Sequence, residues 1–507
     1  MDSHKDVSTV LSRAPEGLEA PLVRVEVHLG VGLPQFALVG LPEAVVRESK
    51  ERVRSALQTS GFEFPVARIT VNLSPADLPK EGGRFDLPIA VGILAATRLI
   101  PARALYKREF YGELSLGGEL RETAKLLPAL VHGARSGNEL ILPEANALEA
   151  SLVGCGRLKL AQRLSQVVVA LKHGKVDGLG SVSAPVSDAA PAVAFGDLAD
   201  VRGQFAAKRA LEIAAAGEHG LLFIGPPGAG KTLLAQRLPG LLPPLRHDEA
   251  LEVASLESAA GRRPTGGLRR PFRSPQHTAS VAALIGGANL RPGELSLAHQ
   301  GVLFLDELPE FPRNALEALR EPLESGVVVV SRLKRTRRFP AQFLLAAAMN
   351  PCPCGYAGDV RGRCHCTAEQ VIRYRSRISG PLVDRIDMHV ELKALPAEHL
   401  VEEAGVGAEN SATIAARVAA ARSLQLSRQG KLNGRLNARE VSQHCALGRD
   451  ARALLTTAIA RLGLSARAYH RVLKLARTCA DLGAASHVGF ADVAEAIKLR
   501  ALDRPTC

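Results

Sequence analysis

A glycine-rich loop in the middle of the chain has the residue types that bind the phosphates of a nucleotide. Its residues, in order, are Gly225, Pro226, Pro227, Gly228, Ala229, Gly230, Lys231 and Thr232. This order matches the G-x4-G-K-[ST] pattern, in which backbone N–H groups close around phosphate oxygens. A helix that begins at the loop would add its partial positive charge. Lys231 would reach the β- and γ-phosphates and the Thr232 hydroxyl would bind Mg²⁺, so the loop predicts ATP and Mg²⁺ as ligands.

Two carboxylates follow a short apolar run farther along the chain. Residues 302–305 (VLFL) are predicted to form a buried strand that ends at Asp306 and Glu307. Asp306 would hold the Mg²⁺ through water, and Glu307 would act as the general base on the attacking water. Together with the phosphate-binding loop, this pair predicts ATP hydrolysis.

Phosphoryl transfer also requires a group that orients water and cations that stabilise the transition-state charge. Asn350 follows the next apolar run, residues 343–349, where a water-orienting amide belongs. Arg385 and Arg467 are candidate cations. Surface arginines are common, so residue type alone leaves the roles of these two open.

Four of the eight cysteines lie close together in the sequence: Cys352, Cys354, Cys364 and Cys366. The two C-x-C pairs can supply four thiolates to a tetrahedral Zn²⁺. One residue separates the cysteines of each pair, which is tighter than usual, so a redox pair or unligated thiols are alternatives. A bound metal would hold the chain that follows Asn350 in place.

Arginines and lysines gather in three segments near these motifs. One cluster is predicted at a hairpin turn between residues 327–330 and 339–345, and its members are Arg332, Lys334, Arg335, Arg337 and Arg338. The other two clusters lie within residues 262–273 and 373–377. Basic loops beside a nucleotide site would hold DNA phosphates without reading sequence. Exposure to solvent or to another subunit is the alternative for each cluster.

Three modules with a largely α/β pattern are expected to position these residues. Residues 1–173 are predicted to be mixed α/β, with strands at 22–29, 36–39 and 67–73 and helices at 43–59 and 86–96. A stretch rich in Gly, Ser, Ala and Pro predicts a linker at residues 174–194. Short apolar runs alternate with helical patterns over residues 195–395, which is typical of a parallel sheet. Residues 396–507 are predicted to be helical.

Composition and charge favour a globular protein with a polyanionic partner. Of the 507 residues, 46% are hydrophobic and 23% are charged, which are ordinary values, and the net charge is +13. Residues 1–195 hold 22 basic and 21 acidic residues, whereas residues 196–507 hold 42 and 30. The excess charge therefore lies in the C-terminal part. Because Trp is absent and aromatic residues make up 4%, we expect contacts with phosphates rather than base stacking.

The sequence also predicts a cytoplasmic location without a membrane partner. It has no apolar run of the length that a membrane span needs, and its first residues do not resemble a secretory signal. Eight cysteines in a chain of this length do not indicate a disulfide framework, which suits a reducing compartment.

Five segments resemble those of one known family. They are residues 271–278 (PFRSPQHT), 301–310 (GVLFLDELPE), 347–356 (AAMNPCPCGY), 377–387 (RISGPLVDRID) and 464–482 (LSARAYHRVLKLARTCADL). Spread in order over nearly the whole chain, they resemble the ComM/YifB family of AAA+ ATPases, often labelled magnesium chelatase-like.

The resemblance implies a fold and a role for each module. Residues 1–173 would have the Lon-protease/ribosomal-protein-S5 domain-2 fold, residues 195–395 would be an AAA+ core with a helix-2 insert and a hairpin before sensor 1, and residues 396–507 would be a helical lid. Asn350 would be sensor 1, Arg385 a trans-acting arginine finger and Arg467 sensor 2. Such a finger implies a ring, expected to be a hexamer.

The family resemblance also implies a process. Proteins of this family are helicases that drive branch migration while incoming DNA recombines during natural transformation, so the expected partner is single-stranded or branched DNA. The alternative is the ATPase motor of a metal-chelatase or protein-remodelling assembly. The Lon-like module has no serine in the segment 80–87 (KEGGRFDL) that matches the family's nucleophile motif. Although Lys125 lies near the partner lysine's position, we therefore expect no peptidase activity.

Overall fold

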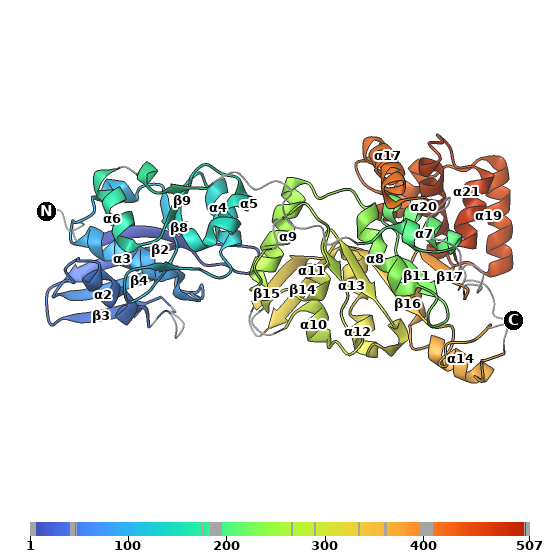
Figure 1. Cartoon of the computed structure of the whole chain (residues 1–507), viewed down its shortest axis with the longest axis horizontal. Helices are drawn as coiled ribbons and strands as arrows, with labels where there is room; N and C mark the ends of the chain where they lie inside the picture. Colours follow the sequence, from blue (N-terminus) through green and yellow to red (C-terminus); the bar gives the residue numbers. More distant parts are fainter. Residues whose placement is uncertain are drawn as a thin grey trace. The chain divides into compact units, whose positions relative to one another are not determined.

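A computed structural model describes residues 7–40, 46, 48–174, 176–182, 195–264, 267–287, 290–332, 335–358, 362–394, 409–500 and 502. The chain forms two compact units (Figure 1). The first consists of residues 1–190 and 247–267, and the second of residues 191–246 and 268–507. Lys334, and residues 183–194 and 396–408 of the predicted linker and lid, lie outside the described residues.

The first unit is built around an eight-stranded mixed sheet with the order β10-β9-β8-β5-β1-β2-β4-β3. Strand β1 pairs antiparallel with β2 and parallel with β5. The strands are β1 (Val7–Arg13), β2 (Leu22–Gly30), β3 (Gln35–Val39), β4 (Arg68–Ser74), β5 (Arg108–Phe110), β8 (Glu139–Pro143), β9 (Leu158–Ala161) and β10 (Gly180–Ser181).

The predicted strands β2, β3 and β4 are all present, whereas β1 was not predicted. Strand β10 lies within residues 174–194, the predicted linker, and pairs with β9. The first part of the predicted linker therefore belongs to the sheet. Alternate residues of β2 and β4 face the core, as expected for a sheet with one buried face. A separate short hairpin consists of β6 (Glu113–Leu114) and β7 (Leu120–Arg121).

Helices cover the sheet of the first unit and bury its apolar residues. They are α2 (Ser49–Thr59), α3 (Asp86–Ala96), α4 (Leu127–Arg135), α5 (Ala147–Val153) and α6 (Leu164–His173). Helix α3 is apolar on nearly every face and is buried from Asp86 to Leu94, because it packs on β1 and β2.

Helix α9 (His247–Ala259) belongs to the first unit although the chain reaches it only after the phosphate-binding loop. Its Ala254 packs with Leu127 and Val131 of α4 in one buried apolar cluster. The Ser258 hydroxyl donates a hydrogen bond of 2.9 Å to the buried carboxylate of Glu149. This helix lies within residues 195–395, which the sequence predicts to form the ATPase core, yet it packs in the N-terminal unit.

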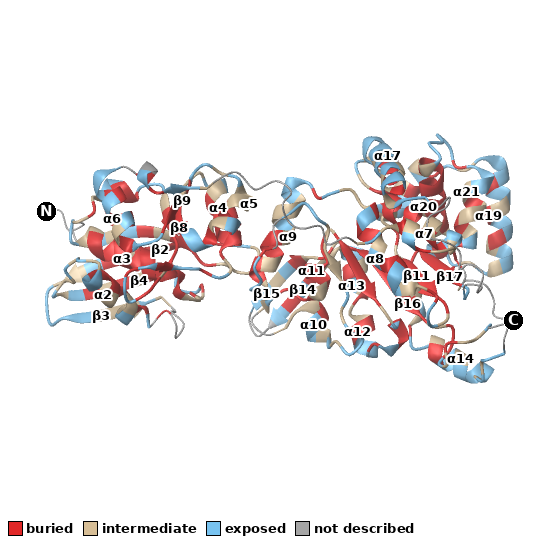
Figure 2. Cartoon of the chain, viewed as in Figure 1, coloured by how far each residue is buried: buried red, intermediate tan, exposed pale blue. Residues whose placement is uncertain are grey.

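The second unit contains a five-stranded, fully parallel sheet with the order β12-β13-β16-β11-β17. Its strands are β11 (Leu221–Ile224), β12 (Phe272–Arg273), β13 (Val302–Leu305), β16 (Leu344–Met349) and β17 (Met388–Glu391). Strands β11, β13 and β16 are buried throughout, in agreement with their apolar sequences (Figure 2). After β11 the chain builds β12, β13 and β16 on one side and β17 on the other. Ligands of such sheets bind at the carboxyl ends of strands where the strand order reverses.

Short helices and a hairpin complete the part of the second unit that contains the parallel sheet. The helices are α7 (Phe205–Gly217), α8 (Lys231–Leu241), α10 (Val281–Ile285), α11 (Glu294–Leu297), α12 (Arg313–Glu317), α13 (Arg320–Ser325), α14 (Ala368–Arg375) and α15 (Gly380–Val383). The hairpin consists of β14 (Val327–Arg332) and β15 (Arg335–Pro340). Its second strand is therefore Arg335–Pro340, and the prediction of a strand over residues 339–345 was wrong.

The C-terminal region is helical, as predicted. Its helices are α17 (Ser411–Gln429), α18 (Ala438–His444), α19 (Arg449–Leu462), α20 (Ala466–Leu482) and α21 (Phe490–Lys498). Buried residues of these helices share one hydrophobic cluster with α7 and the parallel sheet. The C-terminal helices therefore pack as part of the second unit.

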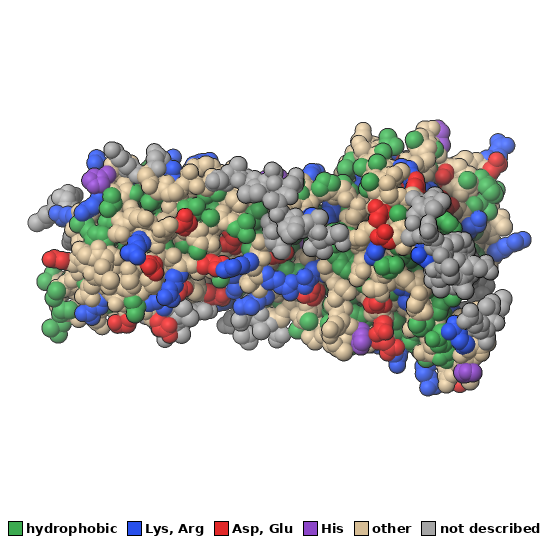
Figure 3. Space-filling model, in the orientation of Figure 1, with side chains coloured by type: hydrophobic (Ala, Val, Ile, Leu, Met, Phe, Trp, Pro, Cys, Tyr) green, Lys and Arg blue, Asp and Glu red, His purple; other side chains and the backbone are tan. Residues whose placement is uncertain are grey.

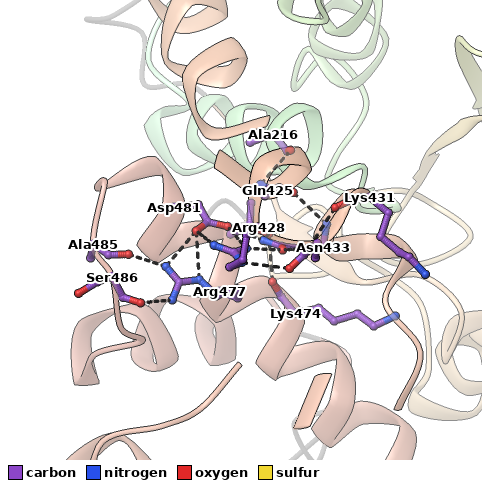
Figure 4. A network of polar contacts seen from close by, with 12 residues as sticks. Ala216, Gln425, Arg428, Lys431, Asn433, Lys474, Arg477, Asp481, Ala485 and Ser486 are labelled. Atoms are coloured by element: carbon purple, nitrogen blue, oxygen red, sulfur yellow. Dashed lines mark hydrogen bonds and ion pairs between the residues drawn. The ribbon is translucent and has the colours of Figure 1, made fainter. Parts of the chain in front are cut away.

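A buried polar network fixes these helices to one another and to α7 (Figure 4). Asp481 of α20 accepts hydrogen bonds from Arg428, Arg477 and Asn433. Gln425 of α17 donates to the carbonyl of Ala216 at the end of α7. Every partner in this network is a charged or strongly polar group, which offsets the cost of burying the Asp481 carboxylate.

Candidate nucleotide-binding site

The phosphate-binding loop connects β11 to α8, and its conformation requires glycine at two positions. Gly228 and Gly230 have φ values of +78° and +87°, in the region that residues with a Cβ rarely adopt. Helix α8 begins at Lys231, directly after the loop. The strand, the loop and the helix N-terminus therefore form the local arrangement that binds phosphate.

Lys231 is held by three oxygen atoms. Its Nζ donates to the carbonyls of Gly225 and Pro226 at 2.7 and 3.1 Å and to Oδ1 of Asn350 at 2.9 Å. Burial lowers the pKa of the ammonium group, and the nearby carboxylates of Asp306 and Glu307 oppose this change. The contact joins the loop after β11 to the residue that ends β16.

Asp306 and Glu307 lie at the carboxyl end of β13. The Thr232 hydroxyl donates to Oδ2 of Asp306 at 2.8 Å. The backbone N–H of Glu307 donates to Oδ1 of Asp306 at 2.9 Å. Glu307 has a φ of +52°, which is unusual for a residue with a side chain and is a strained conformation of the kind found at functional sites.

His277 was not identified from the sequence, yet its Nδ1 lies 3.2 Å from Oε2 of Glu307. It belongs to the segment PFRSPQHT, residues 271–278, and follows β12, the strand beside β13. Tyr374 of α14 was also missed. A hydrogen bond connects it to the backbone of Asn350, and burial together with the charges of Glu310 and Glu307 raises its pKa to about 12. At neutral pH its hydroxyl therefore stays protonated.

A cavity of about 380 Å³ opens above these groups. Its walls include the loop from Pro227 to Thr232, both carboxylates and Asn350. One cavity thus contains a phosphate-binding loop, two carboxylates and an amide. Arg385 and Arg467 are not among the residues that line it.

Both predicted arginines instead contact Glu324 of α13. Nη2 of Arg385 lies 2.6 Å and Nη2 of Arg467 lies 3.4 Å from the same carboxylate oxygen, Oε1. Glu324 was not predicted as a site residue, because it meets its two arginine partners only in the folded unit.

The four clustered cysteines lie close enough to bind one metal ion. The Sγ atoms of all four lie within 4.8 Å of one another. Cys352 is 3.3 Å from Cys354 and 3.8 Å from Cys364, and Cys354 is 3.6 Å from Cys364. A tetrahedral Zn²⁺ with Zn–S bonds of about 2.3 Å would separate sulfur atoms by about 3.8 Å. The donor set therefore fits zinc.

The cysteine loop also touches the phosphate-binding loop. Gly355 has a φ of +86°, and a Cβ there would lie 2.7 Å from Cδ of Pro227. The N–H of Ala357 donates to Sγ of Cys352, as backbone groups that surround metal-bound thiolates do. A metal at this position would thus lie in a loop packed on the nucleotide site.

Within the hairpin, the two faces differ. Val328 and Val330 of β14 are buried with Phe339, whereas Val329 and its partner Arg338 are exposed. Arg335 is exposed near the turn, and burial lowers the pKa of Arg337. The basic residues thus lie on the strands as well as at the turn; nothing is described of Lys334 or of the side chain of Arg332.

Several arginines of the other two basic clusters bind groups of this chain. Arg263 pairs with Glu122 and Arg273 pairs with Glu294. Arg373 pairs with Glu369, and Arg377 pairs with Glu310. Basic and acidic side chains are mixed over much of the visible surface (Figure 3). The hairpin is therefore the better candidate for a surface that binds an anion.

In the first unit, the residues at the Lon-like positions have structural partners. Lys80 is fully buried and donates to the carbonyl of Pro75. Lys125 lies 3.5 Å from Glu81. Among the helices that the structure describes, none has the length and apolar character to cross a membrane.

Three family models match successive parts of the chain. They are described as "Subunit ChlI of Mg-chelatase" over residues 25–146, "Magnesium chelatase, subunit ChlI" over residues 197–400 and "Magnesium chelatase, subunit ChlI C-terminal" over residues 408–500.

Individual proteins match over nearly their full length. The chain is 48% identical to "Competence protein ComM" of Haemophilus influenzae and 46% identical to YifB of Escherichia coli, in each case over 98% of both chains. A "Magnesium-chelatase 38 kDa subunit" of Rhodobacter capsulatus is 29% identical over 29% of this chain and 45% of its own.

Proposed function

Because the chain belongs to the ComM/YifB family, whose members have magnesium chelatase-like domains, we propose that it is an ATP-driven motor that acts on DNA. The observation that carries the ATPase part is the cavity that brings Lys231, Thr232, Asp306, Glu307 and Asn350 together. The Haemophilus influenzae relative is named a competence protein, which supports a role in competence. We propose that the substrate is single-stranded or branched DNA and that the reaction is branch migration by a hexameric ring during natural transformation.

The residues of the cavity divide the hydrolysis step among them. The loop N–H groups and Lys231 bind the β- and γ-phosphates. Thr232 and Asp306, whose oxygens lie 2.8 Å apart, would hold Mg²⁺, which neutralises charge on the phosphates. Glu307 accepts a proton from the attacking water, and His277 at 3.2 Å orients its carboxylate. Asn350 orients the water from the end of β16.

Two further assignments belong to this proposal. The four cysteines bind one structural Zn²⁺, and the support is the fit of their Sγ distances to a tetrahedral site. Arg335 and Arg338 of the hairpin bind DNA phosphates, and the support is that both side chains are exposed, Arg335 beside the turn and Arg338 on the face opposite the buried Phe339.

The decisive experiment measures ATP turnover with and without DNA. We expect branched or single-stranded DNA to stimulate ATP hydrolysis by the wild-type protein and branch migration to require hydrolysis. The Lys231→Ala variant should lose both activities, because the γ-phosphate loses its cation. ATPase activity that DNA does not change would exclude a DNA motor. Stimulation by a protein instead of DNA would favour the chelatase-type or protein-remodelling alternative.

A further inference from the structure

Glu324 lies at the centre of a small charged cluster outside the nucleotide cavity. It is near the end of α13, while Arg385 follows α15 and Arg467 is in the first turn of α20. One carboxylate oxygen lies 2.6 Å from Arg385 and 3.4 Å from Arg467. Segments separated by many residues in the sequence thus bring two guanidinium groups to a single oxygen atom.

Glu324 and Arg467 are each about half exposed, whereas Arg385 is nearly buried and held by a second contact. The Arg385 side chain is 8% exposed, and its Nη1 donates to the carbonyl of Pro381 at 2.7 Å. The start of α20, which carries Arg467, is fixed by a hydrogen bond from the Ala468 N–H to the Ser465 hydroxyl at 3.1 Å. With two of its positions fixed, the cluster is preorganised.

The cluster lies outside the nucleotide cavity of its own chain. Neither arginine lines the cavity with Lys231. Arg385 and Glu324 instead line a second cavity, of about 430 Å³, together with Arg471 and Lys474. Two like charges next to each other are costly without an anion, and Glu324 supplies only one negative charge for two arginines. The cluster is therefore suited to receive a further anion, such as the phosphates of a nucleotide.

We propose that Glu324 is the positioning residue for an arginine pair, Arg385 and Arg467, that acts on the nucleotide bound by the neighbouring subunit of the ring. The proposal rests on the proposed ATPase function. Glu324 does not touch the nucleotide. It holds both guanidinium groups in one place, so that they reach the γ-phosphate of the neighbour as a unit when charge develops in the transition state.

The first test is the Glu324→Gln variant, which removes the charge and preserves the shape. We expect kcat for ATP hydrolysis to fall about tenfold while KM and the affinity for a non-hydrolysable ATP analogue change less than about twofold, because the arginines act mainly in the transition state. Glu321→Gln, on the same helix but outside the cluster, is the matched control and should behave like the wild type. An unchanged kcat in Glu324→Gln overturns the proposal.

The second test asks on which subunit Glu324 acts. Lys231→Ala subunits cannot use their own nucleotide but have intact arginines, whereas Glu324→Gln subunits have an intact loop. In a mixed ring, the intact loop of a Glu324→Gln subunit can meet the intact arginines of a neighbouring Lys231→Ala subunit. Mixing should therefore restore ATP hydrolysis above that of either variant alone. If mixing restores nothing while both variants still assemble, Glu324 acts within its own subunit and the proposal is overturned.

A third test combines Glu324→Gln with Arg467→Gln and does not depend on mixed rings. Arg467→Gln should lower kcat as Glu324→Gln does, and the double variant should be no worse than either, because both changes break one unit. Additive losses overturn the proposal. These outcomes are separate from the DNA test, since wild-type ATPase that DNA does not stimulate would refute the DNA motor and leave the arginine pair standing.

Discussion

Asp387 shows how one buried carboxylate fixes the position of Arg385, two residues away in the sequence. It accepts hydrogen bonds from the His219 ring at 3.3 Å and from the Gly220 N–H at 3.1 Å, and it pairs with Arg471. Burial would raise the pKa of Asp387, but Arg471 and His219 outweigh this effect and hold it well below its ordinary value. The anchor keeps the segment that carries Arg385 beside β11.

Replacement of this carboxylate should destabilise the protein in a pH-dependent way. We expect Asp387→Asn to lower the free energy of unfolding by about 3 kcal/mol at neutral pH, because a buried ion pair loses one partner. A depressed pKa adds stability that is full above the ordinary Asp pKa of about 3.9 and is lost as the pH falls further. Urea denaturation measures the free energy of unfolding of the wild type and of Asp387→Asn. The difference between the two proteins should therefore be smaller at pH 3.5 than at pH 7.

The neighbouring Asp384→Asn serves as control for this measurement. Asp384 caps the short helix α15 and is not part of the buried pair, so its replacement should change stability by less than about 0.5 kcal/mol. A difference between wild type and Asp387→Asn that stays constant with pH would contradict the assigned role of the ion pair.

The sequence predicts the residues that line the nucleotide cavity, but it does not predict the side chains that hold functional candidates in place. Lys231, Asp306 and Asn350 could be placed together because the carboxyl ends of parallel strands meet at one edge. His277, Tyr374 and Glu324 are recognisable only from contacts between segments that no local pattern relates. The same holds for Arg263, whose partner Glu122 lies 141 residues away in the sequence.

Among the elements, the hairpin β14–β15 makes the most direct prediction about DNA. Changing both Arg335 and Arg338 to Gln should weaken binding of single-stranded DNA and reduce the slope of log K against log salt by about 1.4, since two phosphate contacts are lost. Filter binding over a series of salt concentrations measures this slope. The valines of the packed face are unaffected, so the fold should be retained.

Arg373→Gln is the matched control for the hairpin, because Arg373 is exposed and already paired with Glu369. Its replacement should leave the slope as it is. Equal effects of the control and of the hairpin variant would mean that general charge, and not the hairpin, determines the affinity for DNA.

The cysteine loop makes a prediction about metal content. Purified protein should contain about one zinc per chain by elemental analysis, and Cys364→Ser should lose it, because a three-thiolate site binds Zn²⁺ more weakly. Since Gly355 packs on Pro227, the variant should also bind ATP less tightly. Cys155→Ser, in the first unit, should keep its zinc; wild-type protein without zinc would refute the site.

Over the whole molecule, the packing of α9 could not have been expected from the sequence. Its pattern of apolar residues predicts a helix but does not say which surface covers it. In the structure, Ala254 meets Leu127 and Val131, and Ser258 binds Glu149. Strand β1 poses the same problem, because a short alternating segment becomes a strand only through its neighbours β2 and β5.

A charged side chain placed in the apolar cluster between α4 and α9 should destabilise both helices. We expect Ala254→Arg to destabilise the first unit by several kcal/mol, because a cation cannot be paired within an apolar cluster. Hydrogen exchange should then rise in both α4 and α9. Arg263→Gln removes only the exposed pair with Glu122 and should change exchange little. Faster exchange confined to α9 would show that the two helices do not support each other.

The origin of α9 has a practical consequence for truncated proteins. The polypeptide enters the N-terminal unit a second time at residue 247 and returns at residue 267. A fragment that starts after residue 190 would therefore retain a helix stripped of its cover, with Ala254 and Leu256 open to water. Loss of activity in such a fragment could result from this exposed helix and would not show what the N-terminal unit does. Substitutions within the sheet of residues 7–181 test the role of the N-terminal unit without exposing α9.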